Sequence, residues 1–168
     1  MDELQLIFPT KIHELAAEEY LSEHLNFGET TLHGDSGLDS AKSYDEWLVR
    51  INNALTAEIP SIIFFAFRKS DNKMLGTINI RHPYEGYVKI YGHIGYGIRP
   101  SERNKGYATQ MLTLALAHCK EIGLEKVLLT CDKSNTASRK TITKCNGVFE
   151  SESLQDDGEF LQRYWITI

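Results

Sequence analysis

The chain has 168 residues, of which 42% are hydrophobic and 24% are charged, and its formal net charge is −5. This length allows one domain with a substantial core, so we expect residues 1–168 to form a single domain. The acidic balance counts against nucleic acid as a partner, and no apolar run reaches the roughly 20 residues of a membrane span. We therefore expect no nucleic-acid partner and no membrane partner.

The first 60 residues predict one strand, two helices and a long loop. The run Leu-Gln-Leu-Ile-Phe at 4–8 is apolar and is followed by proline, which is typical of a short strand. Apolar residues recur at helical spacing after Thr10, which can cap that helix. The polar segment 27–42 is long for a loop in a small domain, and such loops often carry function. A second helix follows Ser43, where Ser-Tyr-Asp-Glu has the form of a capping box.

The rest of the chain alternates between strands and helices. The pattern predicts an irregular segment at 83–90, strands at 61–68, 74–82, 92–99, 126–131, 148–153 and 160–168, and helices at 135–145 and before Gly123. Strands joined through a helix run parallel, as we expect for 92–99 and 126–131. The order predicts an α+β fold with one mixed sheet of about seven strands and about four helices.

The strand at 92–99 contains three glycines, Gly92, Gly95 and Gly97. An interior glycine weakens a strand by about 0.5–1 kcal/mol, so three of them indicate a bulge or the close approach of another backbone or a ligand. Pro100 then ends the pairing. If this strand diverges from its parallel neighbour, a cleft with free backbone N–H groups opens. A chain that contains amides, such as pantetheine, could bind there in the manner of a strand.

The turn after this strand has the features of an anion site. Arg103, Lys105 and Gly106 precede a helix N-terminus, where free N–H groups and the helix dipole favour negative charge. A pyrophosphate fits such a site. The turn lacks the Gly-Lys-Ser/Thr of a Walker loop, and its glycines are in the wrong order for a dinucleotide site. The alternative is a basic loop that caps an ordinary helix.

Together with the order of elements, "IRPSERNKGYAT" and "NTASRKTITKCNGVFE" resemble the GNAT superfamily of acyl-CoA-dependent N-acetyltransferases. The likeness covers nearly the whole chain and is greatest to a bacterial branch with "GHIGYGIRPSERxKGYAT" and "TCDxxNxAS". It implies a splayed parallel strand pair that binds acyl-CoA, with acetyl-CoA as co-substrate and no metal. It also implies cofactor contacts from Tyr96, Gly97, Ile98, Arg103, Asn104, Lys105, Gly106, Tyr107, Ala108, Asn135 and Ser138.

These contacts have distinct roles in the family. The backbone N–H groups of 103–108 would hold the pyrophosphate, and the backbone of 96–98 would pair with pantetheine and polarise the thioester carbonyl. Asn135 matches the family asparagine that binds the pantetheine arm, and Ser138 would face the same cleft one helical turn later.

The resemblance also suggests a general base. His93 occupies the position where many members have a glutamate, and the ordinary histidine pKa of about 6.5 suits proton transfer from an amine. We expect His93 to share the cleft-facing side of its strand with Gly95 and Gly97. The alternative is a polar histidine with no catalytic part. Ile142 stands where the family often has a tyrosine acid, so water, another side chain or no acid at all would serve the thiolate.

We therefore expect an N-acetyltransferase that moves an acetyl group from acetyl-CoA to a primary amine of a small molecule or peptide by direct attack. An acetyl-cysteine route through Cys131 is an alternative, although a buried hydrophobic role is simpler. A non-catalytic acyl-CoA sensor, and the same fold with another acyl group or acceptor atom, are the alternative functions. The odd set of cysteines predicts a reduced, cytoplasmic protein. The sequence leaves the oligomeric state open, with a homodimer as one alternative.

Overall fold

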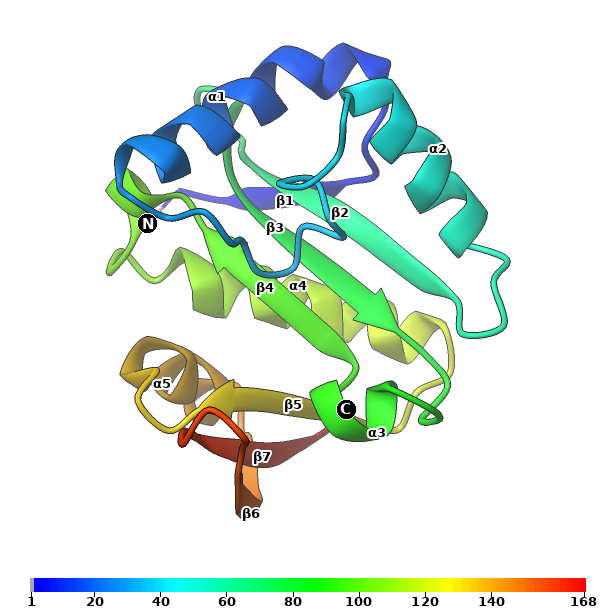
Figure 1. Ribbon diagram of the computed structural model, residues 1–168, viewed down its shortest axis with the longest axis vertical. Coiled ribbons are helices and arrows are strands. Elements are labelled where there is room, and N and C mark those ends of the chain that lie inside the picture. The colour runs from blue at the N-terminus through cyan, green and yellow to red at the C-terminus, as the bar shows by residue number, and fades with distance from the viewer. Residues whose placement is uncertain (1) are drawn as a thin grey trace.

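We describe residues 2–168 from a computed structural model. Its seven strands form two antiparallel sheets, shown in Figure 1. The first sheet has the order β1 (Leu4–Ile7), β2 (Ser61–Arg68), β3 (Lys73–Arg81) and β4 (Ile94–Ile98). The second has the order β5 (Lys126–Asp132), β7 (Phe160–Thr167) and β6 (Val148–Leu154).

The two sheets meet at β4 and β5. These strands run in the same direction in Figure 1 and diverge toward their C-terminal ends. Where they are closest, the His93 N–H donates to the Leu128 carbonyl at 2.7 Å, and Gly92 forms an isolated bridge of antiparallel type with Leu129. The expected seven strands and splayed pair are confirmed, but the sheet is divided in two because β4 and β5 form no ladder.

Helices cover both faces of the first sheet. The chain forms α1 (Glu14–Asn26), α2 (Tyr44–Ala54), α3 (Val88–Tyr91), α4 (Tyr107–Glu121) and α5 (Thr136–Lys144). Figure 1 shows α1 and α2 on one side of the sheet and α4 on the other. The short helix α3 lies in the segment that was expected to be irregular, so residues 2–168 contain five α-helices where about four were expected.

Two apolar clusters hold these layers together. On one face of the sheet, Met111 and Leu112 of α4 pack in a cluster with Ile78 and Ile80 of β3, and all four are fully buried. On the other face, the Trp47 ring stacks on Phe65 with 5.5 Å between centroids. Burying each such side chain stabilises the fold by about 1.5–3 kcal/mol. Both faces of the first sheet are therefore covered by packed side chains. Within residues 2–168, its edge at β4 has no further strand of the same sheet beside it.

The helix starts follow the sequence only in part. The Ser43 hydroxyl accepts a hydrogen bond from the Glu46 N–H at 3.1 Å, as a capping box requires. The Glu46 carboxylate, however, pairs with Arg50 and does not complete the box. At Thr10 a short 3-10 turn precedes α1, and the His13 imidazole accepts the Thr10 N–H at 3.0 Å. Thr10 is the N-cap of this 3-10 turn, which runs directly into α1 at Glu14, so the expected cap lies one turn before the α-helix begins.

Candidate active site

A cleft of about 1400 Å³ opens where β4 and β5 diverge. Its walls come from β4, the loop at 29–37, the N-terminus of α4, the end of β5, α5 and the β6–β7 turn. One edge of β4 pairs with β3, and the edge toward the cleft has no ladder partner within residues 2–168. Backbone N–H and C=O groups are therefore available along that edge, as expected from the sequence.

The glycines of β4 make room for another backbone. The loop at 33–34 lies directly on the strand, so that a Cβ atom at Gly97 would be 2.8 Å from the His33 carbonyl oxygen. In the same way, a Cβ atom at Gly34 would clash with the Gly95 carbonyl oxygen. The Thr77 hydroxyl donates to the His33 carbonyl at 3.2 Å and fixes the loop there. The close approach expected from Gly95 and Gly97 is therefore made by the chain itself.

The N-terminus of α4 has the shape of an anion site. Asn104 and Gly106 both have left-handed backbone conformations, with φ of 61° and 84°. Gly106 is the N-cap and offers no side chain to the first turn, so the N–H groups at the start of the helix point into a concave turn. The Arg103 N–H differs from the expectation, because it donates to the Pro100 carbonyl at 3.3 Å. The free N–H groups therefore begin at Asn104.

The basic side chains of this turn are already paired. Arg103 Nη2 lies 2.7 Å from Glu29 Oε2, and Lys105 Nζ lies 3.0 Å from Glu102 Oε2. The pKa of Glu29 is lowered to about 2, mainly because its carboxylate accepts hydrogen bonds from the Arg103 guanidinium. Lys105 does not line the cleft, whereas 103, 104 and 106–108 do. The turn therefore offers its backbone to an anion, and the side-chain charges expected to assist are balanced by carboxylates.

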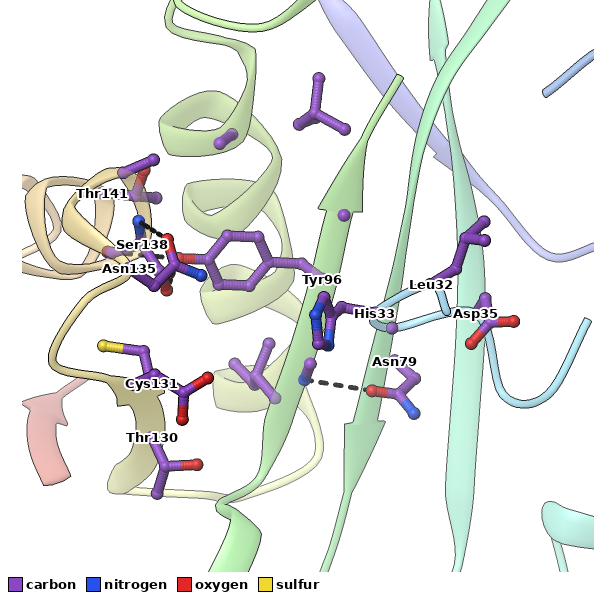
Figure 2. Close-up of a pocket in the computed structure, with 18 of the residues that line it drawn as sticks. Leu32, His33, Asp35, Asn79, Tyr96, Thr130, Cys131, Asn135, Ser138 and Thr141 are labelled. Carbon is purple, nitrogen blue, oxygen red and sulfur yellow. Dashed lines mark hydrogen bonds between the residues drawn. The ribbon is translucent and has the colours of Figure 1, made fainter. Parts of the chain in front are cut away.

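Three of the expected cofactor residues meet across the cleft. Tyr96 reaches from β4 toward α5, and its hydroxyl lies 2.9 Å from Ser138 Oγ (Figure 2). Asn135 is the N-cap of α5, and its side-chain oxygen accepts the Ser138 N–H at 3.0 Å. Its amide nitrogen is left to donate to a ligand. Burial raises the pKa of Tyr96 to about 12, so the phenol keeps its proton. Gly97 and Ile98 line the cleft beside them.

The structure places His93 outside the cleft. Its side chain is 1% exposed, and Nδ1 accepts the Leu128 N–H at 2.9 Å. The ring stacks on Tyr84, with 5.7 Å between centroids. Burial is the main cause that lowers the pKa of His93, which keeps the imidazole neutral near pH 7. The expected cleft-facing position is therefore wrong, because the ring is turned toward β5. The role of His93 as general base stays a prediction, and in this structure the imidazole does not reach the cleft in which the amine would bind.

Two further positions bear on the chemistry. Ile142 is fully buried in the core beneath α5, so this position supplies no acid to the cleft. Cys131 lines the cleft at the end of β5 (Figure 2), and burial raises the pKa of its thiol. A protonated thiol is a poor nucleophile. The buried hydrophobic interpretation of Cys131 fits this environment better than a covalent route.

The sequence indicated that the 27–42 loop carries function, but it singled out none of the cleft residues that β3 contributes. His33 lies on the loop over β4, with its imidazole in the cleft (Figure 2). The Asn79 side-chain amide donates from β3 to the Ser36 hydroxyl at 3.3 Å, and its oxygen accepts the Gly95 N–H at 3.1 Å. Arg81 lines the cleft from the end of the same strand. Asn79 and Arg81 alternate with the buried Ile78 and Ile80, which was the one signal that could have placed them on the face opposite the core.

The family model for the acetyltransferase (GNAT) domain matches residues 11–148. The chain therefore belongs to the GNAT acetyltransferase family. No curated protein sequence matches it. Residues 2–168 include no helix long and apolar enough to cross a membrane, and no group of three or more His, Cys, Asp or Glu side chains that could hold a metal ion.

Many solved structures share the fold at low sequence identity. The ribosomal-protein-S5-alanine acetyltransferase of Vibrio fischeri has a TM-score of 0.78 and 13% identity, and the match covers 99% of this chain and 94% of that one. The microcin C7 self-immunity acetyltransferase, in complex with acetyl-CoA and AMP, has a TM-score of 0.76 and 16% identity, over 100% and 94%. The dodecameric spermidine N-acetyltransferase of Vibrio cholerae has a TM-score of 0.70 and 15% identity, over 98% and 94%.

Proposed function

We propose that the protein is an N-acetyltransferase that transfers an acetyl group from acetyl-CoA to a primary amine by direct attack. The single observation that supports it best is the cleft, in which a free strand edge leads to an uncapped helix N-terminus. An extended amide-containing chain that ends in a pyrophosphate matches both features. Membership of the GNAT family and the acetyl-CoA complex of a structural neighbour support the same donor.

Different residues of the cleft bind different parts of acetyl-CoA in this proposal. In the proposal, the backbone N–H groups from Asn104 to Ala108 hold the pyrophosphate, with the α4 dipole behind them. The free edge of β4 at Tyr96, Gly97 and Ile98 hydrogen bonds to the pantetheine amides. The Asn135 amide donates to the same arm from the opposite wall. When bound, acetyl-CoA supplies an activated thioester carbonyl, which a β4 N–H polarises.

Deprotonation of the amine needs a group inside the cleft. A primary amine with a pKa near ~10.4 arrives protonated at pH 7. His33 is exposed and lines the cleft, and its loop is fixed on β4 beside the expected thioester position. His93 is buried and bonded to β5. The geometry therefore supports His33, in preference to His93, as the group that accepts the amine proton directly or through one water.

The leaving thiolate needs at most one proton. Ile142 does not provide it, whereas the Tyr96 hydroxyl stands at the junction of β4 and α5. In the proposal the Tyr96 hydroxyl donates a hydrogen bond to the thiolate sulfur, and Ser138 holds the phenol in place. The raised pKa of Tyr96 keeps the phenol protonated for this hydrogen bond, and because a thiol is the stronger acid, the thiolate takes its proton from water.

The rival function is a non-catalytic acyl-CoA-binding sensor, and a variant of the main proposal uses another acyl group or acceptor atom. Release of free thiol from acetyl-CoA in the presence of an amine panel separates them. We expect amine-dependent thiol release with one acetylated amine for each thiol formed. Tight binding of acetyl-CoA without release of free thiol in the presence of any amine would favour the sensor.

The homodimer stays a prediction, which sedimentation analysis can test.

A further inference from the structure

Arg81 has an unusual position for an arginine of this protein. It ends β3 and lines the cleft, and the residue as a whole is half-buried. One of its terminal nitrogens, Nη2, lies above Gly95, because a Cβ atom at Gly95 would be 3.5 Å from it. The guanidinium therefore stands over the glycine surface of β4, next to Asn79, which shares that face.

The charge of Arg81 lacks a carboxylate partner. Five of the other six arginines have a carboxylate oxygen within 4 Å, namely Arg50, Arg68, Arg99, Arg103 and Arg163. Among residues 2–168 no carboxylate lies this close to Arg81, and its Nε is buried with no hydrogen-bond partner. Its guanidinium carbon lies over the Tyr87 ring, 5.9 Å from the centroid, in a cation–π contact.

An uncompensated guanidinium is costly in such a place. Burial disfavours its charge and lowers the pKa of Arg81, yet an arginine side chain does not lose its proton in proteins. The favourable solution is an external anion that accepts from the planar N–H groups. Carboxylate and phosphate both match that fork.

The anion must belong to the acceptor and not to the donor. The pyrophosphate turn begins after Ile98, whereas Arg81 stands over Gly95, three residues earlier, or about 10 Å along the strand. His33, the proposed base, comes from the loop that covers the same glycine surface. Arg81 is therefore on the side of the cleft where the amine has to arrive.

Acidic residues also line the cleft, but they lie elsewhere or are already engaged. The Asp35 carboxylate accepts the Asp39 N–H at 2.9 Å and holds its own loop. Asp132, Asp156 and Asp157 are exposed, at the end of β5 and on the β6–β7 turn. Arg81 is the only cationic side chain that β3 and β4 contribute to this cleft.

We propose that the amine acceptor carries an acidic group, carboxylate or phosphate, and that Arg81 binds this group and so selects the substrate. This inference rests on the proposed acetyltransferase function. It predicts a preference for small amines with an anionic end over neutral amines, and rejection of polyamines. Arg81 then acts as a specificity-determining residue, and the proton transfers occur at other side chains.

A matched series of amines tests the preference in the full chain. Propylamine, β-alanine, 2-aminoethylphosphonate and 1,3-diaminopropane are similar in length and differ in the group opposite the amine. We expect the highest kcat/KM for β-alanine or 2-aminoethylphosphonate, and their order tells carboxylate from phosphate. Arg81→Gln should reduce kcat/KM for the preferred anionic amine by about 10–100-fold and leave propylamine within about threefold. Arg81→Lys should restore part of the loss.

The control is Lys89→Gln, which removes an exposed cation near the same end of the molecule but outside the cleft lining. It should leave the ranking unchanged, because a site and not the general field carries the selectivity. Equal kcat/KM for anionic and neutral amines in the native protein, or an unchanged ranking in Arg81→Gln, would overturn the proposal.

A binding measurement keeps this test apart from that of the proposed function. Calorimetric titration of β-alanine and 2-aminoethylphosphonate into the CoA-saturated protein needs no turnover. If no amine is acetylated, binding of one anionic amine that Arg81→Gln abolishes still supports the Arg81 site, while the acetyltransferase function fails. If neither anionic amine binds, or if Arg81→Gln binds them equally well, the Arg81 proposal fails whatever the turnover.

Discussion

The two ends of the cleft differ in how their positive charges are balanced. At the pyrophosphate turn, Arg103 is paired with Glu29 and Lys105 with Glu102. At the other end, Arg81 has no carboxylate partner within the described part of the chain. Backbone N–H groups therefore remain as the means to hold an anion at the first end, and a ligand charge is needed at the second. The pairing of basic residues, more than their number, indicates what each end can bind.

The largest effect should come from His33→Ala, which removes the proposed base from the loop on β4. We expect turnover to fall by about 10²–10⁴-fold, the usual range for loss of a positioned base, with little change in acetyl-CoA affinity. Steady-state rates and calorimetry measure the two quantities. Added imidazole should recover part of the rate in His33→Ala, because a diffusible base can enter the open cleft. Full activity in this variant would show that His33 is not the base, and would leave His93 or water in that role.

A substitution at the other end should act on binding instead. Gly106→Asp places a carboxylate where the pyrophosphate is expected, and repulsion at about 4 Å should reduce CoA affinity by about 10²-fold or more. Gly123→Asp is the matched control, because Gly123 has a similar φ of 85° beyond the opposite end of α4 and faces open space. Calorimetry on both folded variants should find CoA affinity lost in the first alone. Unchanged affinity in Gly106→Asp would contradict the anion turn.

His93→Ala should reduce stability with little effect on the reaction of the folded enzyme. The Leu128 N–H loses its acceptor in the interior, which costs about 1–3 kcal/mol of the free energy of unfolding. Denaturant titration measures this loss, and turnover at low temperature measures the activity. A stable variant with turnover reduced a hundredfold would restore His93 as a catalytic residue.

The same histidine should make stability depend on pH. Burial lowers the pKa of His93 in the folded state, so the unfolded chain takes up its proton first as the pH falls. The free energy of unfolding should be at its full value above about pH 6.5 and decrease below it. His93→Ala should show a shallower decrease. The remaining slope near this pH would come from His13 and His24, whose pKa values burial also lowers. Equal slopes in both proteins would contradict this account.

The smallest effect should follow Glu29→Gln. This change frees Arg103, but the pair is partly exposed and the anion turn uses its backbone, so CoA affinity should change by less than about tenfold. The lowered pKa of Glu29, about 2, contributes stability that the native protein loses between about pH 4.5 and pH 2. The variant should lack that part of the acid transition. A large loss of CoA affinity would show that the ion pair, and not the backbone, shapes the turn.

Local patterns in the sequence were enough to predict the order of helices and strands and the anion turn at one end of the cleft. The anion turn was predictable because the glycine and the helix start are neighbours in the chain, and the apolar stripe of α4 was predictable from its period. The Glu29–Arg103 pair joins residues 74 positions apart, and the bond from Thr77 to the His33 carbonyl spans 44. Such contacts depend on how the layers pack, which no local pattern contains.

His93 shows a second limit of sequence patterns. Alternation along a strand places side chains only when the strand includes them, and β4 begins at Ile94, one residue after His93. Gly92, with φ of 81°, turns the chain just before that point. The histidine therefore follows the turn toward β5 and not the alternation of β4.

The loop that lies on the β4 glycines has a consequence for protein engineering. Acceptor specificity is commonly altered by transplanting a loop from a relative, and residues 33–36 would be a natural choice. Here the His33 carbonyl occupies the space that a side chain at position 97 would fill, and a Cβ atom at position 34 would clash with the Gly95 carbonyl oxygen. A chimera would therefore need glycine at loop position 34, a small residue at strand position 97 and a hydroxyl at 77 to receive the new loop. Loop and strand form one exchangeable module, although about 60 residues of chain separate them.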